Sequence, residues 1–590
     1  MRDLGKRERI MKKKCRQVIC LLLAVLLLMG GIPAAFAVGN CDTAPLIVVS
    51  GMNAWPLVMD AGTEREKQVF APDTQAILEL VGKIAGPVAR FAVTKDYETL
   101  GDEVLPAVYA LLEPLACQPD GSSRYAITTT VYPESMANYP EFVNEEGYLT
   151  NEPAIVRAAA AKIGADHVYY FNYDWRLDPM AHAKELRGYV ERAKRETGHD
   201  KVNLIGSSMG GTIIAAYLAQ YGSEDIDNYT MLSSAFTGTT IVGDLFTGKI
   251  EFHKDALIRI LKEVAGQQVV NLLLDALDQA GVIDILLPVL DELVANLKGR
   301  VYDEVFQDTF VTMPGIWDLI ALEDYEEAKA YLLDEKTDAQ LIARIDAYHY
   351  QVQEKLPELF RAAMETGTKI NVVSHYNLQG VPLTPSYREQ NDNVIDTKYT
   401  SGYATCAFLD ETLPADYQQK HTSCQDATHN HLSGDRVIDA STCLLPEQTW
   451  FLKDLKHVGY IYDTQVMEFI LWLCLSDTQR TVQAAGDYSQ FMRVDPQTGA
   501  LTLIQAERPE EPDSQEPPAQ EPDGPEPTPE GTQPEQPTPA PEESAAPSAE
   551  EAPTPSIADT GERVLGLIPF GLAAVAVAVL TVTRKKNQIS

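Results

Sequence analysis

Short apolar runs alternate with amphipathic stretches over the first part of the chain. Runs rich in β-branched or aromatic residues occupy residues 46–50 (LIVVS), 168–171 (VYYF) and 201–205 (KVNLI). Such runs are typical of buried parallel strands. Residues 179–196 and 211–221 instead space their apolar positions three and four apart, which predicts helices. The alternation predicts an α/β fold with a mostly parallel sheet flanked by helices.

Two further strands are predicted at residues 229–232 and 370–374, and the segment between them departs from this alternation. From about residue 241 to 367 the spacing is helical, with helices expected at 256–264, 269–277, 283–298 and 325–333. Helices inserted into a strand–helix alternation predict a cap over one end of the sheet. An ordinary helical subdomain fits the pattern equally well.

The N-terminal segment, residues 1–37, has the order of a cleavable secretory signal. A basic stretch is followed by an uncharged apolar stretch and then by a small-x-small motif at residues 35–37. The apolar stretch is too short to cross a bilayer, which requires about 20 residues. We therefore expect residues 38–506 to form the exported body of the protein.

The C-terminal part predicts a stalk and an anchor. Residues 507–556 are rich in Pro and Glu, which predicts a disordered stalk. In the surface-anchor segment 557–590, the uncharged run 564–583 is long enough to span a membrane and precedes a basic tail. Residues 557–561 (IADTG) resemble a degenerate sortase signal of Gram-positive surface proteins. An extracellular body attached to the cell wall or membrane of such a bacterium is expected.

Charge and cysteine content narrow the possible partners. The chain has 48 Lys and Arg against 85 Asp and Glu, a net charge of −37. Such an acidic surface repels polyanions, so nucleic acid is not an expected partner. An exported chain permits disulfides, and Cys406 and Cys424, which bracket a polar loop, are expected to pair. Cys474 lies in an apolar run and is expected to be a buried free thiol.

The polar loop also contains His429 and His431. Two histidines at this spacing suggest a metal site, but the sequence shows no clear third ligand, so the interpretation is a polar loop. No metal or organic cofactor is expected.

Residues 206–210 (GSSMG) form a motif that predicts a serine nucleophile. The motif G-x-S-x-G follows a predicted strand and precedes a predicted helix, as a nucleophile elbow requires. Small residues are needed two positions to either side of the nucleophile because the turn is so sharp. Ser208 is therefore the expected nucleophile and Ser207 is not. The alternative is a glycine-rich structural turn.

A serine nucleophile needs a base and an orienting acid, in the chain order Ser, Asp or Glu, His for this type of elbow. His457 precedes the predicted amphipathic helix 464–475 and is the expected base. Asp435, after Ser433-Gly434, is the expected acid, with Asp439 as the second choice. A turn-forming aspartate is the alternative for Asp435.

Stabilising the oxyanion of acyl transfer requires two hydrogen-bond donors. One is expected to be the backbone N–H of Met209, the residue after the nucleophile. The other is expected from the loop after the first strand, at Met52.

These residues together resemble the lecithin:cholesterol acyltransferase family of α/β-hydrolases. The resemblance rests on LIVVSGMN (46–53), on YDWR (173–176), on the elbow, and on Asp435 and His457 with their neighbours. It implies an acyl-enzyme mechanism on lipid esters, with transfer to water, as in a lipase or phospholipase, or to a lipid or other alcohol. Independently of the resemblance, Asp174 and Arg176 at a strand end are expected to pair and fix the loops beside the nucleophile.

The expected function is thus an exported, surface-tethered serine lipase or O-acyltransferase. A surface adhesin on a catalytically decayed hydrolase scaffold is the alternative. In the first case the helical cap is expected to pack over Ser208 and form part of an acyl pocket, with Leu273 and Leu286 among the apolar residues that line it.

Overall fold

The computed structural model describes residues 42–505 apart from 53, 71–73, 144–152, 252, 254–291, 293, 422, 425, 427, 485 and 487. The predicted signal, stalk and anchor, and most of the first three cap helices with Leu273 and Leu286, lie outside the described residues. Within the described part, no helix is long and apolar enough to cross a membrane.

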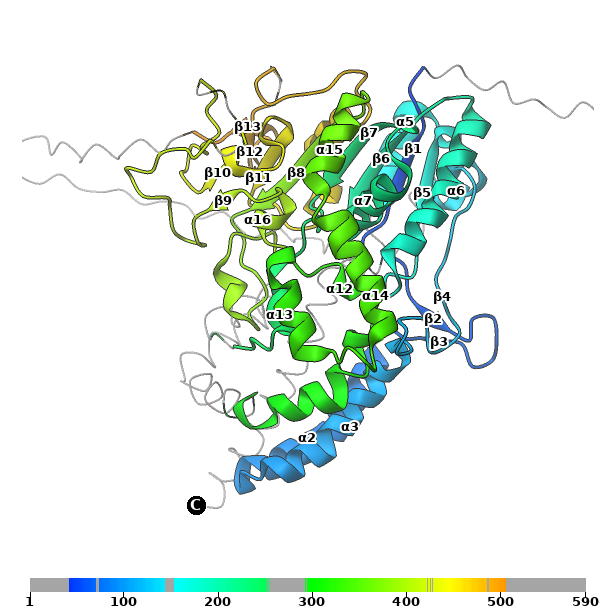
Figure 1. Cartoon of the computed structure of the whole chain (residues 1–590), viewed down its shortest axis with the longest axis vertical. Helices are drawn as coiled ribbons and strands as arrows, with labels where there is room; N and C mark the ends of the chain where they lie inside the picture. The colour runs from blue at the N-terminus through cyan, green and yellow to red at the C-terminus, as the bar shows by residue number, and fades with distance from the viewer. Residues whose placement is uncertain are drawn as a thin grey trace, which may run out of the picture.

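An eight-stranded sheet forms the centre of the protein (Figure 1). In spatial order its strands are β13 (Leu501–Leu503), β12 (Phe491–Val494), β11 (Thr449–Lys453), β8 (Lys369–Tyr376), β7 (Ile226–Leu232), β6 (Val202–Ser207), β1 (Leu46–Val49) and β5 (Val168–Phe171). Neighbouring strands are parallel except β12 and β13. The predicted α/β fold is confirmed, and the five predicted strands correspond to β1, β5, β6, β7 and β8.

Helices cover both faces of the sheet. One face carries α6 (Pro179–Thr197), α7 (Gly210–Tyr221) and α15 (Leu356–Glu365) (Figure 1), and the other carries α5 (Pro153–Ile163) and α17 (Thr464–Cys474). Side chains alternate along a strand, so Ile47 of β1 packs with the first group and Val48 with the second. Burial on both faces explains the uninterrupted apolar runs in the sequence.

The described part of the predicted cap lies at the edge where the parallel strands end. Its helices there are α8 (Thr240–Phe246), α12 (Pro314–Trp317), α13 (Leu322–Leu332) and α14 (Ala339–Tyr348), whereas α15, which the predicted cap also included, packs on a face of the sheet. The Thr212 hydroxyl, at the start of α7, donates to the Asp318 carboxylate after α12 (2.9 Å). The Gly315 N–H donates to the Arg176 carbonyl (3.0 Å). These contacts place the described helices on the side of the sheet where β6 turns into α7.

A helical hairpin that the sequence pattern did not predict extends from this end of the molecule (Figure 1). α2 (Thr74–Thr94) and α3 (Tyr97–Leu112) pack through Val88, Phe91 and Leu100, with Leu297 against them. Each helix contains an internal proline, which ordinarily argues against a helix. The remaining short elements are β2 (Val58–Met59), β3 (Lys67–Gln68), β4 (Ile127–Thr128), α4 (Pro140–Val143), α16 (Thr397–Thr400), β9 (Thr405–Cys406) and β10 (Ile438–Asp439).

Candidate active site

Ser208 occupies the turn between β6 and α7. Its backbone φ is 52°, in the left-handed region that non-glycine residues rarely adopt. The Ser208 N–H donates to the Leu232 carbonyl (3.0 Å), and the Ser208 carbonyl accepts from the Ala235 N–H (3.1 Å). The end of β7 therefore holds Ser208 in the strained conformation that the G-x-S-x-G motif predicts.

The glycines of the elbow are required by close approach of backbone atoms. A Cβ atom on Gly206 would lie 2.8 Å from the Gly211 Cα, and one on Gly210 would meet the carbonyl oxygens of Val49 and Ser50. The elbow thus packs directly on the end of β1. A side chain at Gly210 would push the two apart, and one at Gly206 would clash with the start of α7.

Ser207 and Ser208 differ in their surroundings. Ser207 is buried, and its hydroxyl exchanges a hydrogen bond with the Tyr460 hydroxyl (3.0 Å). Ser208 is half-buried at the tip of the turn. The geometry agrees with the prediction that Ser208, not Ser207, is presented to a substrate.

His457 lies between β11 and α17, where the sequence placed it, and is paired with Asp392. The His457 Nδ1 is 2.7 Å from the Asp392 Oδ2, and the His457 N–H donates to the Asp392 carbonyl (2.8 Å). The Asp392 side chain is fully buried and that of His457 nearly so. Two contacts from one residue fix both the position and the ring orientation of the histidine.

The environment of Asp392 favours its ionised form. Burial acts to raise its pKa, but the nearby His457 ring outweighs burial by charge and hydrogen bonding, so the pKa of Asp392 lies below its ordinary value. The other carboxylate oxygen, Oδ1, accepts from the N–H groups of Val394 (3.0 Å) and Ile395 (2.8 Å). A buried carboxylate held in this way is suited to stabilise a positive charge on His457.

The expected pairing of Asp435 with His457 is wrong. The Asp435 Oδ2 accepts instead from the Lys453 ammonium (3.0 Å) and from the Tyr376 hydroxyl (2.9 Å). The second choice, Asp439, does not face His457 either. Its Oδ2 accepts from the Tyr417 hydroxyl (2.8 Å), and its Oδ1 accepts from Ser441.

The strand order explains the correct partner. β8 and β11 are neighbouring parallel strands, so the loops that follow them meet at one edge. The loop after β8 carries Asp392, and the loop after β11 carries His457. A signal for Asp392 was present in the sequence, since this residue follows the predicted strand 370–374 and precedes His457 in the chain.

The end of β7 and the loop that carries His457 are joined by a second histidine. The His375 Nδ1 lies 3.0 Å from the Ser233 hydroxyl and 3.2 Å from the Lys456 carbonyl, and burial lowers the pKa of His375 to about 4. Between the described Ser208 hydroxyl and the His457 ring no hydrogen bond is formed. In free hydrolases this contact is often long and shortens when substrate binds.

Comparison with known families supports this architecture. A family model described as alpha/beta hydrolase fold matches residues 150–271, the segment that contains β5, β6, the elbow and α7. The chain has the α/β-hydrolase fold. A comparison with curated proteins finds no match.

In this α/β-hydrolase, Ser208, Asp392 and His457 follow one another in the chain order of the fold, after β6, β8 and β11. The predicted oxyanion donors lie at the same edge, Met209 directly after Ser208 and Met52 in the turn after β1. Within the described residues, neither N–H donates to a backbone acceptor.

The YDWR segment braces the loop after β1. Arg176 is fully buried and forms a bidentate ion pair with Asp174 (2.6 and 2.9 Å). The Tyr173 hydroxyl donates to the Ser50 carbonyl (3.0 Å). The expected structural pairing of Asp174 and Arg176 is confirmed.

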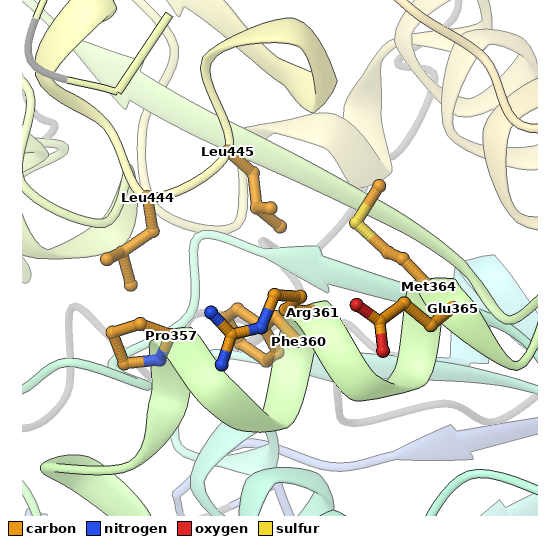
Figure 2. Close-up of a pocket in the computed structure, with 7 residues that line it drawn as sticks. All are labelled: Pro357, Phe360, Arg361, Met364, Glu365, Leu444 and Leu445. Carbon is orange, nitrogen blue, oxygen red and sulfur yellow. The ribbon is translucent and has the colours of Figure 1, made fainter.

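An open groove of about 460 Å³ lies between α15 and the loop before β11, away from the candidate active site. Figure 2 shows Phe360 and Arg361 of α15 facing Leu444 and Leu445 across it. None of Ser208, Asp392 and His457 lines this groove, so it is not the candidate active site.

The structure corrects the prediction of a disulfide between Cys406 and Cys424. Cys406 and Cys424 are both free thiols, so the expected disulfide is not formed. Cys474 is a buried free thiol, as expected. Cys424 and Glu447 join His429 and His431 in one cluster, which supplies the additional ligands that the sequence did not reveal.

Proposed function

We propose that this α/β-hydrolase is a serine esterase or acyltransferase that uses Ser208, His457 and Asp392 as its catalytic triad. The observation that carries the proposal is the 2.7 Å contact between the His457 Nδ1 and the buried Asp392 carboxylate. It lies at the strand edge where Ser208 stands in a left-handed elbow. A structural turn alone has no need for this combination.

The proposed reaction begins with proton transfer from the Ser208 hydroxyl to the His457 Nε2 while the Ser208 Oγ attacks the ester carbonyl carbon. Asp392 accepts the Nδ1–H bond and stabilises the imidazolium. The N–H groups of Met209 and Met52 are proposed to hold the oxyanion. The leaving alcohol takes the proton from His457, which leaves the acyl group on Ser208.

The second half returns the enzyme to its starting state. Water, or a lipid or other alcohol, gives a proton to His457 and attacks the acyl carbonyl, and Ser208 leaves with that proton. We propose a lipid ester as the acyl donor, as the likeness to lecithin:cholesterol acyltransferases implies. An enzyme that acts on such a donor needs an apolar wall at the site, because an acyl chain gains about 0.8 kcal/mol for each methylene buried against one.

A fluorophosphonate probe tests the nucleophile. We expect the probe to label wild-type protein at Ser208, to label Ser207→Ala equally and to leave Ser208→Ala unlabelled. Esters of increasing chain length, offered with and without an alcohol acceptor, then distinguish hydrolysis from transfer. Wild-type protein that resists the probe and hydrolyses no ester would contradict the proposal and favour a binding protein on a decayed scaffold.

We further propose that the enzyme is exported and tethered to the cell surface, on the support of the sequence patterns at residues 1–37 and 557–590. Protease treatment of intact cells should release an active fragment that ends between residues 507 and 560. Activity confined to the cytosol would contradict this location.

A further inference from the structure

A second group of polar side chains lies in the loop that leads from β9 to β11. Cys424, His429 and His431 come from this loop, and Glu447 comes from the turn immediately before β11. One ligand atom of each residue lies within 4.8 Å of those of the other three. Cys424 and His431 are buried and the other two are half-buried, so the group forms one partly enclosed cluster.

The four atoms are spaced as metal ligands are. The Cys424 Sγ is 3.6 Å from the His429 Nδ1 and 3.3 Å from the Glu447 Oε1. Zinc–ligand distances of about 2.0–2.3 Å in a tetrahedron place two ligands about 3.3–3.6 Å apart. The Glu447 Oε1 lies closer to the His431 Nε2 (3.1 Å) and to the His429 Nδ1 (2.5 Å). Among these four distances, the two between Glu447 and the histidines must increase to admit an ion.

The hydrogen bonds of Gln490 determine the tautomer of His431. The Gln490 amide nitrogen donates to the carbonyls of Pro446 (2.9 Å) and Thr449 (3.0 Å), so the Gln490 oxygen is the atom that faces the His431 Nδ1 (2.8 Å). The Nδ1 must therefore carry a proton. In the neutral ring the Nε2 then presents a lone pair to the Glu447 carboxylate. A proton or a metal cation between the His431 Nε2 and the Glu447 carboxylate satisfies both atoms.

His429 has a matching arrangement. Its Nδ1 points at Cys424 and Glu447, while its Nε2 lies 3.5 Å from the Asp426 carboxylate. Metal-binding histidines generally direct their second nitrogen to such an oxygen, which fixes the ring and its tautomer. Both histidines thus turn one nitrogen to the cluster and the other to an oxygen outside it.

We propose that Cys424, His429, His431 and Glu447 bind a zinc ion in a closed, structural site. Thiolate and imidazole ligands favour zinc over the hard cations Mg²⁺ and Ca²⁺. One thiolate and one carboxylate neutralise the charge of the ion. Binding releases the thiol proton of Cys424 to solvent. Four protein ligands leave no open position in a tetrahedral site, so the ion does not activate water.

The site attaches a long excursion of the chain to the start of β11, at the opposite end of this strand from the active-site edge. Glu447 lies in the turn that leads into β11, and β11 leads to His457. Among the described contacts none joins the four ligands to Ser208, Asp392 or His457. The zinc ion therefore holds the loop in place and takes no part in acyl transfer. This inference stands independently of the proposed function.

Elemental analysis of the untagged full chain tests the site. We expect about one zinc per chain after purification without added metal. After removal of zinc by a chelator, added Co²⁺ should give the visible bands of a tetrahedral site and a thiolate charge-transfer band. Wild-type protein that retains neither ion after incubation and desalting would overturn the proposal.

Three variants assign the ligands. Cys424→Ser should abolish the charge-transfer band, and His431→Gln should weaken metal binding by more than the 10- to 100-fold that is typical for loss of an outer hydrogen-bond partner. Cys406→Ser, which removes a thiol outside the cluster, should keep the wild-type spectrum. If a ligand variant does not fold, the thiolate band of wild-type protein still decides. Absence of that band, or its loss in Cys406→Ser alone, would refute the assignment.

Discussion

Two loops bring a carboxylate to the edge where β8 and β11 end, and they use it differently. The loop after β8 presents Asp392, which is fully buried against His457. The loop before β11 presents Asp435, which binds the Lys453 ammonium and the Tyr376 hydroxyl at the ends of the same two strands. The residue type and the region of the fold are shared, and only the partner differs.

The partner determines what each carboxylate can do. A lysine is a permanent cation at neutral pH, so the pair of Asp435 and Lys453 is a fixed ionic contact. A histidine gains and loses a proton in the physiological range, so a carboxylate beside it can stabilise a charge that exists only during turnover. The comparison teaches that an acid near an active site is assigned by the group that it contacts.

The largest expected effect tests whether this edge is catalytic at all. Ser208→Ala should lower ester turnover by about 10⁶-fold, because the attacking oxygen is lost. Ser207→Ala removes only the hydrogen bond to Tyr460 and should retain most activity. Initial rates on a short-chain ester measure both. If Ser207→Ala lost more activity than Ser208→Ala, the nucleophile would be Ser207, and the assignment of this edge as the active site would fail.

Exchanging the two acids for amides tests the comparison directly. Asp392→Asn should lower kcat by about 10⁴-fold, because the amide favours the wrong histidine tautomer and cannot stabilise the imidazolium. Asp435→Asn is the matched control and should leave kcat within about tenfold, since its partner is not catalytic. A larger loss in Asp435→Asn than in Asp392→Asn would restore the assignment based on sequence.

The next prediction concerns the buried His375, which contacts the loop that carries His457. Burial lowers its pKa to about 4, so between about pH 6.5 and 4 the unfolded chain binds a proton here and the native state does not. The free energy of unfolding should therefore fall by about 3 kcal/mol over this window and be insensitive to His375 above it. Urea unfolding of wild type and of His375→Asn at several pH values isolates this part. A pH-independent difference between the two would show that the native ring takes up its proton over the same pH range as the unfolded chain, and would contradict the lowered pKa.

The smallest expected effect concerns the stability supplied by Asp435. Asp435→Asn should lower the free energy of unfolding at pH 7 by about 1–3 kcal/mol, because it leaves the hydrogen-bonded Lys453 ammonium without its carboxylate. The urea midpoint gives the change. An unchanged midpoint together with lost activity would mean that Asp435 serves the active site after all.

The central architecture could be predicted from sequence because its signals are local. Strands buried on both faces, such as residues 46–50 and 370–374, have mostly apolar residues in succession. The elbow combines a strand, two glycines and a helix within a few residues. These features depend on neighbours along the chain. The structure shows them with shifts of only a few residues at their ends.

What could not be predicted depends on contacts between distant segments. Ser433-Gly434-Asp435 has the same local appearance whether the carboxylate meets His457 or Lys453, and only the folded sheet decides. The same holds for Glu447, which joins two histidines from another part of the loop. The α2–α3 hairpin was missed for the opposite reason, since its internal prolines argued locally against helices that packing nevertheless stabilises.

The place of β1 in the sheet sets an order for folding. β1 is the first strand in the chain, yet it lies between β5 and β6 and pairs Leu46 with both Val168 and Asn203. Neither edge of β1 gains a partner in the sheet until these later segments are present. Contacts of such long sequence separation form slowly, because loop closure precedes the gain in free energy. A chain delivered from its N-terminus must therefore keep this apolar strand unpaired through the synthesis of about the first third of its length. Residues 46–49 then need protection from aggregation during biogenesis.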